Sequence, residues 1–238
     1  MKLLQLLFLL LLLWSCGYDN NKPTVVYLGD STAQELLVDS TLIITSELPI
    51  HFDHTDYLLF PIGPIQGYGR SSKIYLGSGS SGDDSFAIGY VSGTTYNGQL
   101  DNIKIQHVDS ANFKPLTDQK IKLRSIQFLE SIRKETGMQL LAIEATDRDT
   151  NNDGKLTNDD VESLYMAQIN GTGFRKLSLD NHELLDWRVV AINKRLYFRT
   201  VEDVNKDGEF DSEDKVHHYF ANLEREFEVV EYNPLEGF

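Results

Sequence analysis

Two twelve-residue segments of the chain place oxygen-bearing side chains at alternating positions. Loop 1, residues 149–160, reads DTNNDGKLTNDD, and loop 2, residues 203–214, reads DVNKDGEFDSED. Both follow the pattern D-x-N-x-D-G-x-hydrophobic-x-x-x-D. Carboxylate, amide and carbonyl oxygens are the ligands that calcium prefers, and it takes about six to eight of them. The pattern therefore predicts one calcium ion in each loop.

The spacing gives each position of these loops a role. Side-chain oxygens at positions one, three and five turn inward, position seven supplies its main-chain carbonyl, and position nine binds directly or through water. The carboxylate at position twelve closes the site, and glycine at position six permits the sharp turn. The predicted ligands of loop 1 are Asp149, Asn151, Asp153, Lys155 (carbonyl), Thr157 and Asp160. Those of loop 2 are Asp203, Asn205, Asp207, Glu209 (carbonyl), Asp211 and Asp214.

Both loops resemble the calcium loop of the EF-hand family. Aspartate at position twelve, in place of the usual glutamate, is similar to dockerin loops. However, strand-like segments flank each loop, such as 139–145 before loop 1 and 163–169 after it. The resemblance therefore implies a structural or clamping role for calcium and not a switch that opens a pair of helices. An Asx-rich turn without metal is the alternative interpretation.

The charge of the chain supports a bound cation. It has 36 acidic and 22 basic residues and a net charge of −14, and the two loops hold ten of the acidic residues and only two lysines. Carboxylates packed this densely repel one another unless a cation neutralises them. The same negative charge argues against nucleic acid as a partner, and against binding to an anionic lipid surface through charge.

The N-terminal residues predict export and a lipid anchor. Residues 3–14 are almost continuously apolar but too few to span a bilayer, which is typical of a signal peptide. Residues 13–16, Leu-Trp-Ser-Cys, resemble the lipobox of bacterial lipoproteins, although Trp14 is bulky for its position. The resemblance implies a signal peptide at 1–15, lipid on Cys16, and a tether at 16–24. Glycine after that cysteine favours the outer membrane. An ordinary cleaved signal is the alternative.

The rest of the chain, 25–238, follows mainly the patterns of β-strands. Short runs of β-branched and aromatic residues are bounded by Gly, Asn, Asp or Pro. Only short helices are predicted, near 32–38 and within 126–136. Cys16 is the only cysteine, so this body has no disulfide, and its stability must come from a hydrophobic core and from any bound metal.

Three parts of the chain share one order of strands. Each ends with a strand, a short turn, and an aromatic residue followed three positions later by an aliphatic one. These pairs are Phe113/Leu116, Phe174/Leu177 and Phe227/Val230. Two further strands precede each such motif. Four strands per unit, in units at roughly 41–119, 120–180 and 181–233, predict antiparallel blades like those of a β-propeller.

The middle unit resembles the TolB-like β-propeller repeat. The resemblance rests on the strand at 163–165, the turn Asn-Gly-Thr-Gly at 170–173 and the closing Arg-Lys-Leu-Ser at 175–178, and it extends over 120–231. Propellers usually need at least four blades to close, and this chain has room for about three. We therefore expect an open stack of three sheets, a β-sandwich derived from blades, or half of a homodimeric ring. A plain antiparallel β-domain is the generic alternative.

Together these features favour a calcium-binding lipoprotein of the cell envelope that is a non-enzymatic binding or structural module. Its partners would be the membrane, reached through the lipid, and a protein or glycan ligand. Two alternatives remain open. One is a propeller-type hydrolase that uses surface carboxylates, although no serine lies in a recognisable nucleophile motif. The other is a dockerin-like docking module, which needs a helix after each loop.

Overall fold

The computed structural model describes residues 22–27, 35–37, 42–66 and 89–237. Cys16, the predicted signal peptide, most of the tether and most of the helix expected near 32–38 lie outside the described residues. The helix α2 (Glu130–Thr136) falls within the range 126–136 in which the sequence predicts one. None of the described helices is long and apolar enough to cross a membrane.

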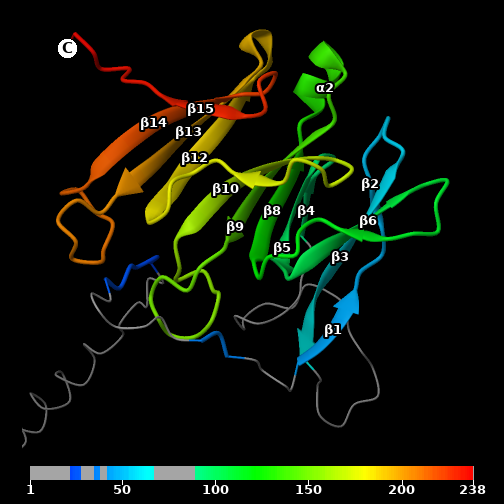
Figure 1. The fold of residues 1–238 in the computed structure, drawn as a ribbon, viewed down its shortest axis with the longest axis horizontal. Helices are drawn as coiled ribbons and strands as arrows, with labels where there is room; N and C mark the ends of the chain where they lie inside the picture. Colours follow the sequence, from blue (N-terminus) through cyan, green and yellow to red (C-terminus); the bar gives the residue numbers. More distant parts are fainter. Residues whose placement is uncertain (1–21, 28–34, 38–41, 67–88, 238) are drawn as a thin grey trace, which may run out of the picture.

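The described strands form three antiparallel sheets, which we name A, B and C in chain order (Figure 1). Sheet A contains β1 (Leu42–Ser46), β3 (Tyr57–Gln66), β6 (Asn102–His107) and β7 (Lys114–Pro115), with β2 (Ile50–His51) beside β3. Sheet B contains β8 (Lys122–Phe128), β9 (Leu140–Thr146), β10 (Glu162–Gln168) and β11 (Arg175–Lys176), extended beyond β8 by β5 (Thr95–Leu100) and β4 (Gly89–Ser92). Sheet C contains β12 (His182–Val190), β13 (Arg195–Glu202), β14 (Lys215–Asn222) and β15 (Glu228–Glu231), and the single-turn helix η2 (Ala191–Asn193) joins its first two strands.

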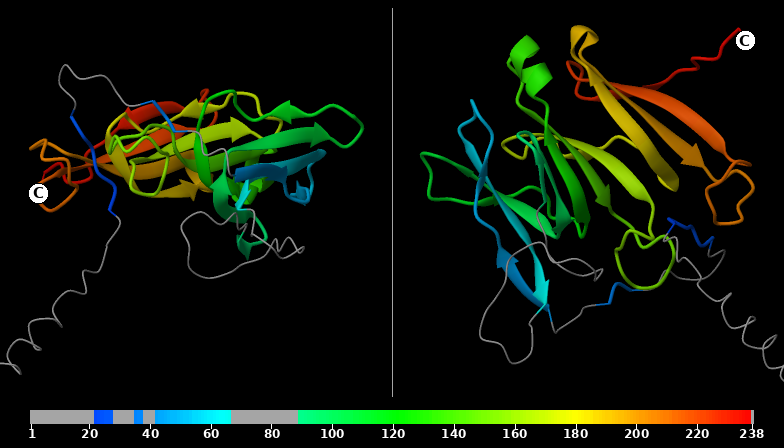
Figure 2. Two further views of the ribbon diagram at one scale, coloured as in Figure 1. Left: turned by 90° about the horizontal axis from the view of Figure 1, so that it is seen from below. Right: turned by 180° about the vertical axis from the view of Figure 1, so that it is seen from behind.

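Each sheet is built on a meander of four strands, which confirms the predicted mainly β fold with three blade-like sheets. The sheets stack side by side with sheet B in the middle, and the described strands do not close into a ring (Figures 1 and 2). The β4–β5 hairpin lies in the connection between two strands of sheet A but pairs with β8 of sheet B. Sheet B therefore contains strands from the first predicted unit, 41–119, as well as from the second, 120–180.

The central strands of sheet B are apolar on both faces, and they are covered by sheet A on one side and by sheet C on the other. Alternate side chains of β9 point to opposite sides, so Leu141 and Ile143 join the core toward sheet A while Leu140 and Ala142 join the core toward sheet C. A strand covered on both faces reads as a nearly continuous apolar run. This explains the sequence Leu-Leu-Ala-Ile at 140–143.

Loop 1 and loop 2 occupy equivalent places in the fold. Loop 1 joins β9 to β10 and loop 2 joins β13 to β14, the second and third strands of the meanders in sheets B and C. Both loops lie at the same end of the sheets, opposite α2 and η2, with residues 22–27 beside them (Figures 1 and 2). Strands flank each loop as predicted, and the helix that a dockerin-like module needs follows neither loop.

Candidate metal centres

The two loops share one backbone conformation. Position four has a positive φ in both, 59° at Asn152 and 60° at Lys206. Position six is also left-handed, with φ of 82° at Gly154 and 89° at Gly208. Residues other than glycine and asparagine seldom adopt a positive φ. A positive φ at both position four and position six of each loop therefore defines a specific tight turn. The pattern D-x-N-x-D-G thus encodes the same turn twice.

The aspartate at position one anchors that turn from inside. In loop 1, the carboxylate of Asp149 accepts the N–H groups of Asp153 at 3.0 Å and Gly154 at 2.7 Å. In loop 2, the carboxylate of Asp203 accepts the N–H groups of Lys206 at 2.6 Å and Gly208 at 2.9 Å. Position one therefore holds the first six residues of each loop in the same kind of turn.

Positions three and five add two side-chain turns in each loop. Asn151 and Asn205 each accept, through Oδ1, the N–H group two residues later at 3.0 Å. Asp153 accepts the N–H group of Lys155 at 2.8 Å, and Asp207 accepts that of Glu209 at 2.9 Å. Position nine forms a similar turn, with Thr157 accepting from Asp159 and Asp211 accepting from Glu213.

The aspartate at position twelve ties the end of each loop to its beginning. Asp160 accepts the N–H groups of Thr150 at 2.7 Å and Thr157 at 2.9 Å, one at each oxygen. Asp214 does the same with Val204 and Asp211, both at 3.0 Å. The shorter side chain of aspartate suits this role, because it reaches the loop backbone while closing the ring.

The two hydrogen-bond networks share the bonds made by positions three, five, nine and twelve. They differ at position one, which accepts from positions five and six in loop 1 and from positions four and six in loop 2. Among the residues that the structure describes, no three His, Cys, Asp or Glu side chains group as a ready-made metal site. The predicted ligands include three aspartates in loop 1 and four in loop 2, and neither set forms such a group in this structure. A carboxylate oxygen that accepts one N–H, such as Oδ2 of Asp160, still has a lone pair for a cation. Oδ1 of Asp160 already accepts the N–H groups of Thr150 and Asn151 and the hydroxyl of Thr150.

Burial shows that loop 1 in particular fits a cation. Asp160 is only 1% exposed, and this burial raises the pKa of its carboxyl group. The Oδ1 atom of Asp159 is buried without a hydrogen bond to any described group. Asp159 is at position eleven and is not one of the predicted ligands, so it adds a carboxylate beside the predicted set of oxygen donors, which suits calcium. Leu156 and Phe210 at position eight are half-buried and belong to neither core.

Residues 24–26 lie across both loops and connect them. The N–H group of Thr24 donates to the carbonyl of Asp159 in loop 1, and that of Val25 to the carbonyl of Gly208 in loop 2. The N–H group of Val26 then returns to Thr150 in loop 1, at 2.7 Å. Val25 is 6% exposed. The segment next to the predicted tether is therefore held by both candidate metal centres.

The contact at Gly208 has a measurable consequence. A Cβ atom at Gly208 would lie 2.5 Å from the carbonyl oxygen of Val25, whereas one at Gly137, which also has a positive φ, would meet nothing within 4 Å. Both Gly→Ala substitutions cost the left-handed strain of about 1–2 kcal/mol. We expect Gly208→Ala to lower the free energy of unfolding by about 1–3 kcal/mol more than Gly137→Ala. Equal losses in urea unfolding would show that residues 24–26 do not dock as described.

A partly buried pair of carboxyl groups between sheets B and C was not predicted from the sequence. Glu162 begins β10, directly after loop 1, and Arg124 Nη1 lies 3.3 Å from its Oε1 atom. Glu183 of β12 accepts the N–H group of Glu162 at 2.7 Å. Burial raises the pKa of both carboxyl groups, that of Glu183 to about 8. No spacing rule links these residues, because only the packing of the two sheets brings them together.

The raised pKa of Glu183 makes stability depend on pH. Between its ordinary value of 4.5 and about 8, the folded protein binds more protons at this group than the unfolded chain, so the free energy of unfolding falls as pH rises. We expect Glu183→Gln to raise the melting temperature at pH 8–9 and to change it little near pH 5. The melting curves of the two proteins over this range test it, and a constant difference between them would contradict the assignment.

Comparison with known proteins identifies no family for the chain. No protein-family model and no curated protein sequence matches the chain. One matching solved structure is described as "The structure of putative TolB from Agrobacterium tumefaciens"; it is 10% identical, the match covers 79% of this chain and 80% of that one, and the TM-score is 0.23. The name agrees with the TolB-like repeat that the sequence suggests. At this TM-score, however, the likeness supports no inference about fold or function.

Proposed function

We propose that the protein is a calcium-braced lipoprotein of the bacterial cell envelope and a non-enzymatic binding or structural module. The observation that best supports calcium is that loops 1 and 2, at equivalent places in adjacent sheets, share the hydrogen bonds made by positions three, five, nine and twelve. If loop 1 were only an Asx-rich turn without metal, a second loop with the same hydrogen bonds would not be expected at the equivalent place in the next sheet. Loop 1 would hold its ion with Asp149, Asn151, Asp153, Thr157, Asp160 and the carbonyl of Lys155, and loop 2 with the corresponding residues 203–214.

Calcium at these sites would stabilise the end of the fold that carries residues 24–26. Four acidic residues in loop 1 and six in loop 2 repel one another, and a divalent ion removes most of that repulsion. Because the two loops contact the same short segment, an ion in either loop also fixes the surface against which that segment packs. Extracellular calcium modules commonly bind at about 10⁻⁴–10⁻³ M, so calcium at about 10⁻² M would fill both sites.

Thermal unfolding tests the bracing directly. We expect the melting temperature in millimolar calcium to exceed that in EDTA by several degrees, because calcium binds only the folded state. Asp153→Ala and Asp207→Ala should each remove part of the shift, and together nearly all of it. Asp109→Ala is the control, since its carboxylate is 88% exposed and lies outside both loops. An unchanged melting temperature in calcium would contradict the proposal.

The lipid anchor rests on the residues Leu-Trp-Ser-Cys at 13–16 and is tested separately. We expect the full-length protein, expressed in a bacterial host, to incorporate labelled palmitate and to enter the detergent phase of a Triton X-114 separation. Cys16→Ser should abolish both, because no other cysteine is present to carry lipid. Labelling that survives in Cys16→Ser, or a wild-type protein without label, would contradict the anchor.

A further inference from the structure

A cleft of about 700 Å³ opens between sheet B and the first strand of sheet C, away from both calcium loops. It continues the interface between the two sheets. Toward β10, the facing surface of sheet B is apolar and sealed by sheet C, with Leu164 and Met166 in the shared core. Toward β8 and β5, the same surface is polar and open. The volume is typical of small-molecule binding sites.

One wall of the cleft is a ladder of neutral polar side chains. Thr95 of β5 lies opposite Gln127 of β8, and Asn97 lies opposite Ser125, so the four form two cross-strand pairs on one face. None of these four side chains makes a hydrogen bond with any other group in the described ranges of the chain. They present hydroxyl and amide groups that can both donate and accept.

The other wall is apolar and centred on Trp187. Leu185, Trp187 and Val189 alternate along β12 and line the cleft together. The indole Nε1 of Trp187 donates to Glu144 Oε1 at 2.7 Å, which fixes the ring at the boundary between the sealed core and the open cleft. A register shift between Leu184 and Asp186 marks a bulge just before this ring, and bulges re-aim side chains beside binding sites.

Most charged groups that line the cleft are already paired. Glu130 accepts from Arg133 at 2.7 Å, and Asp186 accepts from Arg199 at 2.8 Å. The bond from Arg133 lowers the pKa of Glu130 to about 2, and the bond from Arg199 lowers that of Asp186. A glycosidase acid must carry a proton near neutral pH, and the bonds from the two arginines favour the ionised form of Glu130 and Asp186. The third carboxylate that lines the cleft, that of Glu144, accepts from Trp187.

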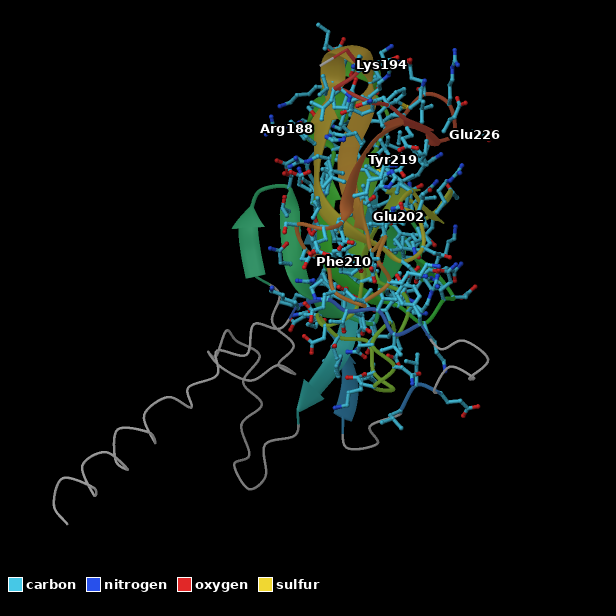
Figure 3. All side chains as sticks on the ribbon, turned by 90° about the vertical axis from the view of Figure 1, so that its left-hand side faces the viewer. Arg188, Lys194, Glu202, Phe210, Tyr219 and Glu226 are labelled. Atoms are coloured by element: carbon cyan, nitrogen blue, oxygen red, sulfur yellow. The ribbon has the colours of Figure 1, made fainter. Side chains whose placement is uncertain are left out.

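Arg188 stands apart from these pairs. Figure 3 shows it on the same side of the molecule as the β4–β5 hairpin, at the edge strand of sheet C. It is exposed and lines the cleft beside Trp187. A single cation in a chain of net charge −14 does not favour a polyanion. The lining side chains that have no hydrogen-bond or ion-pair partner among the described residues are therefore mainly neutral.

We propose that this cleft binds a neutral oligosaccharide. Sugar hydroxyls would pair with the side chains of Asn97, Ser125 and Gln127, and the C–H face of a sugar ring would pack against Trp187. A ligand of this kind matches a site with hydroxyl and amide groups on one wall and an aromatic ring on the other. The inference rests on the proposed role as a binding module and is independent of calcium.

Tryptophan fluorescence gives a specific probe of the cleft. The chain has two tryptophans, Trp14 and Trp187, so in Trp14→Phe the whole signal comes from the cleft. We would titrate this protein with cellohexaose, xylohexaose, maltohexaose and mannohexaose, and in parallel with polygalacturonate and a set of tetrapeptides. The proposal expects a saturable change with at least one neutral oligosaccharide. Saturation only with polygalacturonate or a peptide, or with no probe, overturns it.

Variants on the polar wall then locate the site. Asn97→Ala and Gln127→Ala should each weaken binding of the active oligosaccharide by about five- to thirtyfold, since each removes hydrogen bonds worth about 1–2 kcal/mol. Gln119→Ala, an exposed amide that does not line the cleft, should leave the affinity unchanged. Unweakened binding in both wall variants overturns the site. Matching circular dichroism spectra confirm that the variants fold.

A calcium titration of the same protein separates this inference from the proposed function. Oligosaccharide binding without a calcium effect on melting would support the cleft and contradict the bracing. A calcium effect without oligosaccharide binding would do the reverse. Asp153→Ala, in loop 1, should bind the oligosaccharide with unchanged affinity in excess calcium, because no loop residue lines the cleft.

Discussion

The central strands of the middle sheet are covered on both faces, and this burial determines where in the molecule a polar site can form. Sheet B supplies alternate side chains to two cores, one shared with sheet A and one with sheet C. Its central strands therefore have no free face on which a polar site could form. Chemistry is confined to the ends of the strands and to the edge where sheets B and C separate. The calcium loops lie at the first of these places and the Trp187 cleft at the second.

The strand-end position explains why the loops can brace the fold. In each loop, aspartates at positions one and twelve turn inward to satisfy main-chain N–H groups, which concentrates negative charge at the loop centre. This arrangement organises the backbone at the cost of repulsion between carboxylates, and a divalent ion would remove that repulsion. Residues 24–26 bind to both loops, so the same ions would also secure the segment that follows the predicted anchor.

Local pattern was sufficient to predict much of this structure. The period of the apolar residues predicted strands at 139–145 and 163–169, close to β9 and β10. The repeated aromatic and aliphatic pairs predicted three four-stranded units, and the hydrogen bonds that loops 1 and 2 share follow from their common spacing. These features are local because each depends on residues within one unit.

Features that depend on contact between units could not be predicted in this way. The β4–β5 hairpin lies between two strands of sheet A in the sequence but pairs with β8 of sheet B, and no property of residues 89–100 predicts that pairing. Glu162 and Glu183 meet only because two sheets pack together. The cleft lies where that packing ends. It brings together Asn97, Gln127 and Trp187, which are far apart in the sequence, so no local pattern predicts that they line one site.

The central claim is that each loop holds one calcium ion, and the stoichiometry of binding tests it most directly. Equilibrium dialysis of the metal-free protein against radioactive calcium counts the ions bound per chain. The account predicts two ions per chain in the wild-type protein, one in Asp207→Ala, and none when Asp153→Ala is added. A wild-type protein that binds no calcium at millimolar concentration would contradict it.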